Sequence, residues 1–204
     1  LATSPTNSTI GVESWLAVCT PMLALVAPGP RVTKHTPGRR VIPMADMVQK
    51  IRVARDARSG DDGIVIIART DARTNHGLDE ALRRAEAYLK AGADVLFVES
   101  PESEEEMRQI GRSVDKPLLA NMVEGGRTPV LTHEELQAIG YKLAIFPVTA
   151  LLAATQAMKQ VYTQLQRQGS SAAGSTALMP FAELTQLMGF EDVWAFERQY
   201  AETP

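Results

Sequence analysis

Four short apolar stretches of this sequence are each followed by polar or turn-forming residues that could do chemistry. The residues that follow are Arg-Thr-Asp at 69–71, Glu-Ser-Pro at 99–101, Asn-Met-Val-Glu-Gly-Gly at 121–126 and Pro-Val-Thr at 147–149. Arg69 offers a bidentate fork to a carboxylate or phosphate, Asn121 donates from its amide, and glycines let backbone N–H groups approach a ligand closely. Together with Glu99, these residues predict a site for a small anionic substrate.

Each candidate also has a purely structural interpretation. Arg69 could form a structural ion pair with Asp71 or Glu99, because buried charges need partners. Asn121, which follows the third apolar stretch, could simply form a turn. Asp71 and Arg73 are interpreted as solvated loop residues rather than as parts of the site.

A second candidate region is the polar, turn-rich stretch 34–39, which contains His35 and reads as a flexible functional loop. The other two histidines, His76 and His133, lie in polar surroundings and are interpreted as surface residues. The sequence has no spacing typical of a Ser-His-Asp triad, a metal-binding histidine pair or a phosphate-binding glycine loop.

The segments between these motifs predict alternating strands and helices. Apolar, largely β-branched runs predict strands at 64–68, 95–98, 117–120 and 143–146. Apolar residues at helical spacing predict helices at 44–58, 78–91, 104–114, 132–139 and 149–168, with two short helices in 180–201. This alternation predicts an α/β fold with a parallel sheet, whose strands end at one edge and gather the polar residues there. An open doubly wound sheet and part of a closed barrel both fit.

Length and composition limit the classes of function. The 204 residues are 45% hydrophobic and 22% charged with a net charge of −3, which indicates one soluble globular domain. A complete eight-fold β/α barrel typically needs ~250 residues. The acidic balance and the 5% aromatic content argue against a nucleic-acid partner. The single cysteine, Cys19, excludes a disulfide framework and favours a reducing, cytoplasmic compartment.

The first thirty residues differ from the rest, because Glu13 is their only charge. The apolar run 15–27 is too short to span a bilayer and follows no positive segment, so no membrane partner is expected. It is expected to cover one side of a core as a strand or helix fragment, while residues 1–9 are expected to be disordered. The predicted division is an atypical or disordered segment at 1–34, a β/α domain at 35–169, and a linker with C-terminal helices at 170–204.

Five motifs together resemble one known group of enzymes. They are, in order, Ile-Ile-Ala-Arg-Thr-Asp-Ala at 66–72, Gly-Ala-Asp at 92–94, Phe-Val-Glu-Ser-Pro at 97–101, Asn-Met-Val-Glu-Gly-Gly-x-Thr-Pro at 121–129 and Phe-Pro-Val-Thr-Ala at 146–150. The sequence resembles the isocitrate lyase/phosphoenolpyruvate mutase superfamily over residues 35–203. Within it, the likeness is to short members such as methylisocitrate lyases, dimethylmalate lyases and carboxyvinyl-carboxyphosphonate phosphorylmutases.

The resemblance implies a fold and a chemistry. The chain would form about four C-terminal units of a (β/α)8 TIM barrel, with C-terminal helices that exchange with a neighbouring subunit in a homo-dimer or tetramer. Members bind a 2-oxo or 2-hydroxy acid on Mg²⁺ and break a C–C bond, or rearrange a P–C bond, through a pyruvate-type enolate. By resemblance, Arg69 is the catalytic clamp of the substrate and enolate, and Glu99 and Asn121, with Met122 and Val123, complete the substrate contacts.

The sequence departs from the family pattern at three places. The acidic Asp-Ala-Asp-Thr-Gly and Ile-Glu-Asp motifs that hold Mg²⁺ do not occur in it, so none of its residues is predicted as a metal ligand. The catalytic cysteine loop of the lyases corresponds to residues 28–39, which keep His35 as a substrate-binding candidate but lack the cysteine. Leu152 replaces an arginine of the methylisocitrate lyases, which argues against a tricarboxylate substrate.

Three functions therefore remain open at the level of sequence. The first is a Mg²⁺-dependent lyase that cleaves a C–C bond in a 2-oxo or 2-hydroxy di-acid such as oxaloacetate, of which this chain would be a truncated copy. The second is the branch of the family that makes or breaks P–C bonds in phosphonates. The third is a non-catalytic half-barrel that assembles with a full-length homologue.

Overall fold

The computed structural model of the chain describes residues 22–26, 41–58, 63–172 and 174–200. Two compact units, Leu1–Thr149 and Ala150–Pro204, can be distinguished, and each is described by itself. The site motifs at 69–71, 99–101, 121–126 and 147–149 all fall in the first unit.

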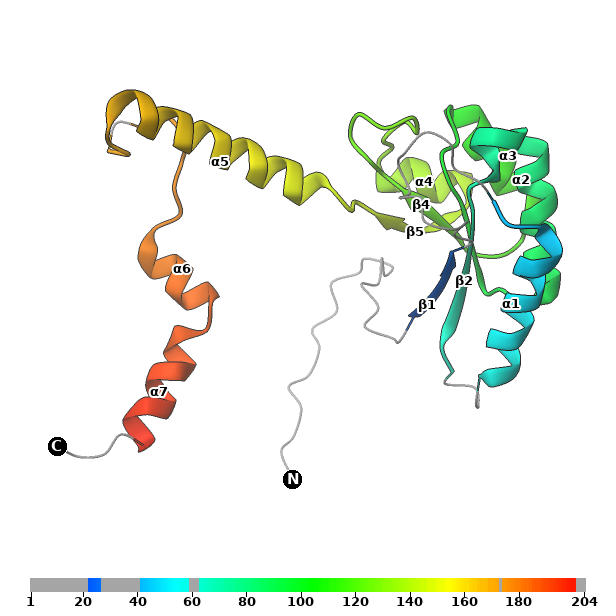
Figure 1. Cartoon of the computed structure of the whole chain (residues 1–204), viewed down its shortest axis with the longest axis horizontal. Coiled ribbons are helices and arrows are strands. Elements are labelled where there is room, and N and C mark those ends of the chain that lie inside the picture. Colours follow the sequence, from blue (N-terminus) through cyan, green and yellow to red (C-terminus); the bar gives the residue numbers. More distant parts are fainter. Residues whose placement is uncertain (1–21, 27–40, 59–62, 173, 201–204) are drawn as a thin grey trace. The chain divides into compact units, whose positions relative to one another are not determined.

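The first unit is built on a five-stranded sheet in which neighbouring strands pair in parallel (Figure 1). Its strands follow one another in chain order: β1 (Met22–Val26), β2 (Val65–Thr70), β3 (Val95–Val98), β4 (Leu118–Asn121) and β5 (Tyr141–Ile145). Four of them confirm the predicted strands within a few residues. The fifth, β1, lies in the apolar run 15–27, for which the sequence left strand and helix open.

Along the chain, a helix lies between each strand and the next, as expected for parallel strands. They are α1 (Met44–Ala57), α2 (Ala72–Ala91), α3 (Glu104–Ser113) and α4 (His133–Ile139). The prediction placed the start of the second helix at residue 78, whereas α2 begins at Ala72 and is kinked at Gly77, which has a φ of +82°. The apolar periodicity begins only after this glycine, so it could not reveal the first turn.

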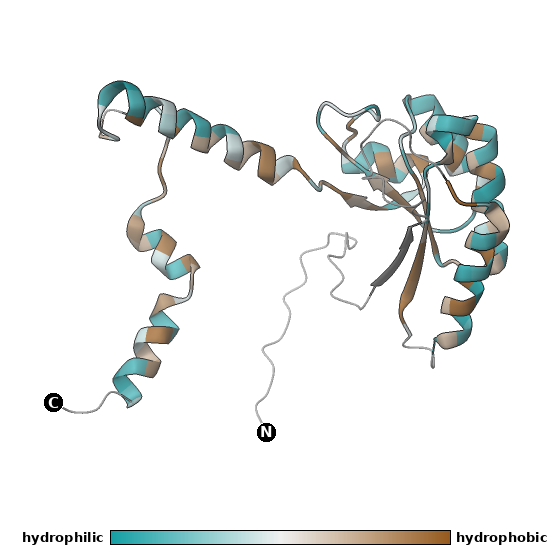
Figure 2. Ribbon diagram, viewed as in Figure 1, coloured by the Kyte–Doolittle hydropathy of each residue, from teal (hydrophilic) through white to brown (hydrophobic). Residues whose placement is uncertain are grey.

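The two faces of the sheet have different neighbours. Alternate strand residues such as Ile66, Leu96 and Leu118 pack with side chains of all four helices in one large core. The intervening residues form a second, smaller group of buried side chains from the strands alone, which we call the opposite-face cluster: Ile67, Val95, Phe97 and Leu119. Figure 2 shows β2 as a mainly hydrophobic ribbon, whereas the helices packed beside the sheet alternate between hydrophilic and hydrophobic segments. This arrangement, with helices on one face of sequentially ordered parallel strands, is that of part of a β/α barrel.

The second unit is helical and strongly apolar at its surface. It contains most of α5 (Thr149–Gln168), together with α6 (Phe181–Leu187) and α7 (Phe190–Tyr200), and none of the residues of these helices is buried. Phe181 and Leu187 are 79% and 71% exposed. Among the described residues, no helix is both long enough and apolar enough to cross a membrane.

The close packing of α3 on α4 depends on a residue without a side chain. A Cβ added at Gly111 would lie 2.1 Å from the backbone oxygen of Ile139, far inside van der Waals contact. The C-terminus of α4 is also fixed at this point, because Gly140 ends the helix in the left-handed conformation with a φ of +112°.

We therefore expect Gly111→Ala to destabilise the protein, although alanine favours a helix by ~1 kcal/mol over glycine. The added methyl group must push the two helices apart, and such overpacking typically costs ~1–3 kcal/mol. Urea unfolding would measure the change, with the exposed Gln109→Ala of the same helix as the control. A Gly111→Ala variant as stable as the wild type, or more stable, would contradict this packing.

Candidate functional site

The alternation of side chains along the strands brings three polar residues to the same face. Arg69 in β2, Glu99 just after β3 and Asn121 in β4 each lie two residues after a member of the opposite-face cluster. Their side chains therefore project from the sheet face that points away from the helices, at the carboxyl edge of the sheet. The convergence predicted from the strand ends is confirmed by their contacts.

Arg69 is held by two carboxylates and an aromatic ring. Its Nε donates to Asp71 Oδ1 over 2.6 Å, and its Nη2 lies 3.4 Å from Glu99 Oε2. The guanidinium carbon lies 4.8 Å from the ring centroid of Phe97 on the neighbouring strand. Only 6% of Arg69 is exposed, and Nη2 has no well-aligned hydrogen bond among the described residues. The guanidinium is therefore buried against Glu99, and its donor Nη2 is not fully satisfied by that contact.

Glu99 is the common partner of the site. It is 4% exposed and accepts hydrogen bonds from Asn121 Nδ2 at 3.3 and 3.5 Å and from Ser100 Oγ at 3.4 Å. Asn121 Oδ1 is buried without a hydrogen-bond partner in the described part of the chain. Asn121 and Arg69 thus share Glu99 as a partner, and the amide oxygen of Asn121 is an unused acceptor.

The backbone after Glu99 adopts an unusual conformation. Ser100 has a φ of +60°, the only positive φ of a non-glycine residue in the described segments. This left-handed conformation costs roughly 1–2 kcal/mol for an L-amino acid, and such strain gathers at functional sites. It turns the chain sharply between the end of β3 and the start of α3.

A cavity of about 220 Å³ opens beside these residues. Its lining comes from the segments that follow β3 and β4: Glu99, Ser100, Asn121, Val123, Gly126, Arg127 and Thr128. Since a water molecule occupies ~30 Å³ in the liquid, the space suits a small organic acid of a few non-hydrogen atoms. A larger hollow of about 420 Å³ lies beside α5, where glutamine and hydroxyl side chains line it together with Lys159 and Arg167.

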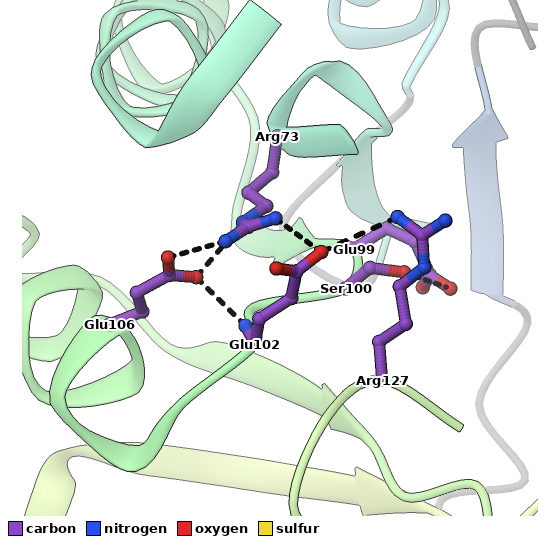
Figure 3. Close-up of polar contacts among 6 residues, drawn as sticks. All are labelled: Arg73, Glu99, Ser100, Glu102, Glu106 and Arg127. Carbon is purple, nitrogen blue, oxygen red and sulfur yellow. Dashed lines mark hydrogen bonds and ion pairs between the residues drawn. The ribbon is translucent and has the colours of Figure 1, made fainter. Parts of the chain in front are cut away.

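An ion-pair network fixes the segment that carries Glu99 (Figure 3). Arg73 grips Glu106 with two hydrogen bonds of 2.6 and 2.9 Å, and its Nη1 lies 2.5 Å from Glu102 Oε1. Glu106 also accepts from the backbone N–H of Glu102 at 2.8 Å. The hydrogen bonds from Arg73 lower the pKa of Glu106, and the same bonds raise the pKa of Arg73.

The interpretation of Asp71 and Arg73 as solvated loop residues is wrong. Their side chains are only 13% and 16% exposed, because each is paired with a charge from the site or its neighbourhood. The partners of Arg73 lie about thirty residues further along the chain, in a different β/α connection. A local sequence pattern carries no signal for such a pairing.

The segment after β5 also reaches the site region. Thr149 Oγ1 donates to a carboxylate oxygen of Glu124 over 2.5 Å, and this hydrogen bond lowers the pKa of Glu124. The predicted turn at 147–149 is thereby tied to the segment that follows Asn121.

The remaining predicted site residues lie in three different places. Val123 lines the cavity. Met122 is fully buried in the core on the helix face, and its backbone N–H donates to the carbonyl oxygen of Ile145. His35 lies outside the described residues. The roles assigned to these three residues remain predictions.

Arg127 also lines the cavity. The sequence did not predict it, because it lies in the middle of a loop rather than at a strand end.

The described residues do not by themselves form a metal site. In the segments that the structure describes, no group of three or more His, Cys, Asp or Glu side chains is placed to hold an ion. The two carboxylates nearest the centre, Asp71 and Glu99, are both engaged by Arg69. They therefore do not fit the role of Mg²⁺ ligands.

Comparison with known sequences identifies relatives. The profile of the phosphoenolpyruvate phosphomutase family matches residues 31–166. The 2,3-dimethylmalate lyase of Eubacterium barkeri is 45% identical over 172 residues, which are 84% of this chain and 59% of the relative. The 2-methylisocitrate lyase of Bacillus subtilis (strain 168) is 36% identical over 174 residues, 85% of this chain and 57% of the relative. The chain thus spans somewhat more than half the length of these two relatives.

Comparison with solved structures gives a consistent result. A crystal structure of 2,3-dimethylmalate lyase superimposes with a TM-score of 0.71 at 35% identity, covering 82% of this chain and 56% of that one. A phosphonopyruvate hydrolase in complex with oxalate and Mg²⁺ superimposes with a TM-score of 0.72 at 27% identity, covering 88% of this chain and 62% of that one. The fold predicted from the sequence, part of a TIM barrel, is thereby confirmed.

The ion pair between Arg73 and Glu106 predicts a pH-dependent loss of stability in Arg73→Gln. Hydrogen bonds to a charged group contribute ~1.5–3 kcal/mol, and a loss in this range is expected at pH 7. Because the folded-state pKa of Glu106 is lowered, its contribution is full above the unfolded pKa of ~4.3 and is lost as the pH falls through the folded value. The free-energy difference between variant and wild type should therefore shrink in urea unfolding below about pH 4.

The exposed pair of Arg112 and Glu105 offers a matched control, since Arg112→Gln removes a guanidinium from the surface of α3. It should change stability little at either pH. An Arg73→Gln deficit of the same size at pH 7 and pH 3 would show that the ion pair is not its cause.

Proposed function

The chain belongs to the isocitrate lyase/phosphoenolpyruvate mutase superfamily, and from this premise we propose that it binds a small 2-oxo or 2-hydroxy di-acid and takes part in cleaving one of its C–C bonds. The observation that carries the proposal is the contact of Arg69, Glu99 and Asn121 beside a cavity of the size of such an acid. The relatives named above as lyases favour carbon–carbon cleavage.

The proposed chemistry follows from the donors and acceptors of the site. In a 2-hydroxy di-acid the hydroxyl group loses its proton and becomes a carbonyl group as the adjacent C–C bond breaks. The electron pair of that bond stays on the other fragment, where it is delocalised as an enolate with negative charge on oxygen until a proton is added to carbon. A nearly buried guanidinium stabilises such charge more strongly than it could in water, because little solvent competes for its donors. In this proposal Nη2 of Arg69, which Glu99 satisfies only incompletely over 3.4 Å, binds a substrate oxygen, and Asn121 with Glu99 orients the acid.

The remaining predictions for the site belong to the same proposal. Val123 would form the apolar part of the cavity wall, and Met122 would anchor the segment after Asn121 in the core. His35 would contribute from the segment that precedes α1. Leu152, in place of an arginine, favours a di-acid over a tricarboxylate.

The metal requirement has to be separated from the role of these residues. A related hydrolase binds Mg²⁺ together with oxalate, but the described residues of this chain do not fit a Mg²⁺ site. Arg69, Glu99 and Asn121 are therefore assigned to the organic acid alone.

The phosphonate branch is the second candidate, because the matching profile is that of the phosphomutase. Turnover by this chain, the non-catalytic alternative and the cytoplasmic location remain predictions.

Binding of oxalate, an analogue of the enolate of pyruvate, tests the proposal directly. Isothermal titration of the whole chain with oxalate, with and without Mg²⁺, should show binding that Arg69→Lys weakens at least tenfold. A lysine ammonium cannot reproduce the fork of donors that a guanidinium offers, and a tenfold loss corresponds to ~1.4 kcal/mol.

The matched control is Arg84→Lys, because Arg84 is also a buried arginine, 7% exposed against 6% for Arg69, and its Nε lies 2.7 Å from Glu80 on α2. Arg84→Lys should lower the stability of the protein but leave its affinity for oxalate unchanged. Equal effects of the two variants, or no oxalate binding by the wild type, would contradict the proposed function. Release of pyruvate from dimethylmalate or oxaloacetate, compared with turnover of phosphonopyruvate, would decide between the two branches.

The predicted homo-oligomer is a further part of the proposal. Large apolar side chains of α6 and α7 are exposed, and exposed apolar patches mark interaction sites. We expect the wild type to sediment as a dimer or larger. Phe181→Ser combined with Leu187→Ser should shift the mass towards the monomer, whereas Gln186→Ser should not. A monomeric wild type in analytical ultracentrifugation would contradict this part of the proposal.

A further inference from the structure

Arg127 supplies the positive charge of the cavity wall. The other charged residue of the lining is Glu99, which already has three partners. An acid that enters the cavity therefore meets one cationic group on its wall. A substrate group with a negative charge is therefore favoured next to Arg127.

The present partner of Arg127 holds it only weakly. Its Nη1 lies 3.4 Å from Glu102 Oε1, an oxygen that is already 2.5 Å from Nη1 of Arg73. Arg127 is 55% exposed, whereas Arg73 is 16% exposed and well paired. Glu102 thus shares its charge between two guanidiniums and is bound chiefly by Arg73 (Figure 3). Such a long, exposed ion pair contributes little and is readily exchanged.

The two arginines of the site consequently differ in kind. Arg69 is buried, is fixed by Asp71 and by the ring of Phe97, and is not part of the cavity lining; in the proposed function it acts at the reacting end of the substrate. Arg127 sits on a loop after β4, lines the cavity and has a partner that it can leave. This is the arrangement expected for a group that closes on the far end of a ligand.

We propose that Arg127 is the specificity-determining residue that pairs with the second acidic group of a di-acid, and that Glu102 is the counter-ion it leaves when the acid binds. This inference rests on the function proposed above and adds the reason for choosing a di-acid over a mono-acid of the same length. It also assigns opposite effects to two residues in contact with each other. Arg127 favours the di-acid, and Glu102 competes with it.

A matched pair of ligands isolates this contribution. Malate and 2-hydroxybutyrate are both four-carbon 2-hydroxy acids and differ by a carboxylate in place of a methyl group. Isothermal titration of the whole chain should show tighter binding of malate. In Arg127→Gln the dissociation constant of malate should rise about tenfold, as expected for one charge-assisted hydrogen bond, with 2-hydroxybutyrate within about twofold of the wild type.

Two further variants sharpen the experiment. Glu102→Gln removes the competing carboxylate and should tighten malate binding a few-fold, again with little effect on 2-hydroxybutyrate. Arg83→Gln is the control, because Arg83 is 57% exposed and paired with a glutamate, yet lies on α2 outside the cavity lining. It should change neither affinity. Thermal unfolding of each variant would verify that it is folded, which is expected because Arg127 is half-exposed.

The outcomes separate this inference from the proposed function. If Arg69→Lys abolishes binding of both acids while Arg127→Gln affects both equally or neither, the function stands and the role of Arg127 is overturned. If Glu102→Gln weakens malate as strongly as Arg127→Gln does, the pair is structural and the inference also fails. If the wild type binds neither acid nor oxalate, the proposed function itself fails and this inference with it.

Discussion

A carboxylate that is removed from water must be neutralised where it lies, and the architecture of this site follows from that requirement at Glu99. Its oxygens meet the guanidinium of Arg69, the amide of Asn121 and the hydroxyl of Ser100, so one buried charge joins the ends of three neighbouring strands. Removing a single partner would leave the others uncompensated, which is far more costly than an absent surface pair. The strand ends therefore form one unit rather than three independent positions.

Much of this unit was predictable because its signals are local. Apolar runs fixed the strands, parallel strands end at one edge, and the residue just past each run was polar, which was enough to select Arg69, Glu99 and Asn121. The same alternation along a strand also places Met122 on the helix face, next to the core. The sequence carries this signal too, because side chains alternate between the two faces of a strand and Met122 follows Asn121 by one residue.

Other parts of the site were not predictable from the pattern of residues. The pairing of Arg73 with Glu106 joins two different β/α connections, and nothing in either segment specifies the other. Arg127 belongs to a loop whose course is set by tertiary packing, so neither periodicity nor strand ends pointed to it. Asp71 is polar and follows a strand, yet its burial depends on the arginine two residues before it. Ion pairs between segments that are far apart in the sequence leave no local pattern from which they could be predicted.

The left-handed backbone at Ser100 has an implication for any attempt to make this protein more robust. Local preference and required geometry disagree at this residue, a form of frustration that natural chains retain where activity benefits from it. Directed evolution for heat resistance alone would reward glycine here, which adopts the same turn without steric cost. The gain in melting temperature would come with a looser pivot beneath Glu99. The same exchange would also remove the hydroxyl of Ser100 that donates to Glu99 over 3.4 Å, so a backbone gain and a side-chain loss would meet at one residue.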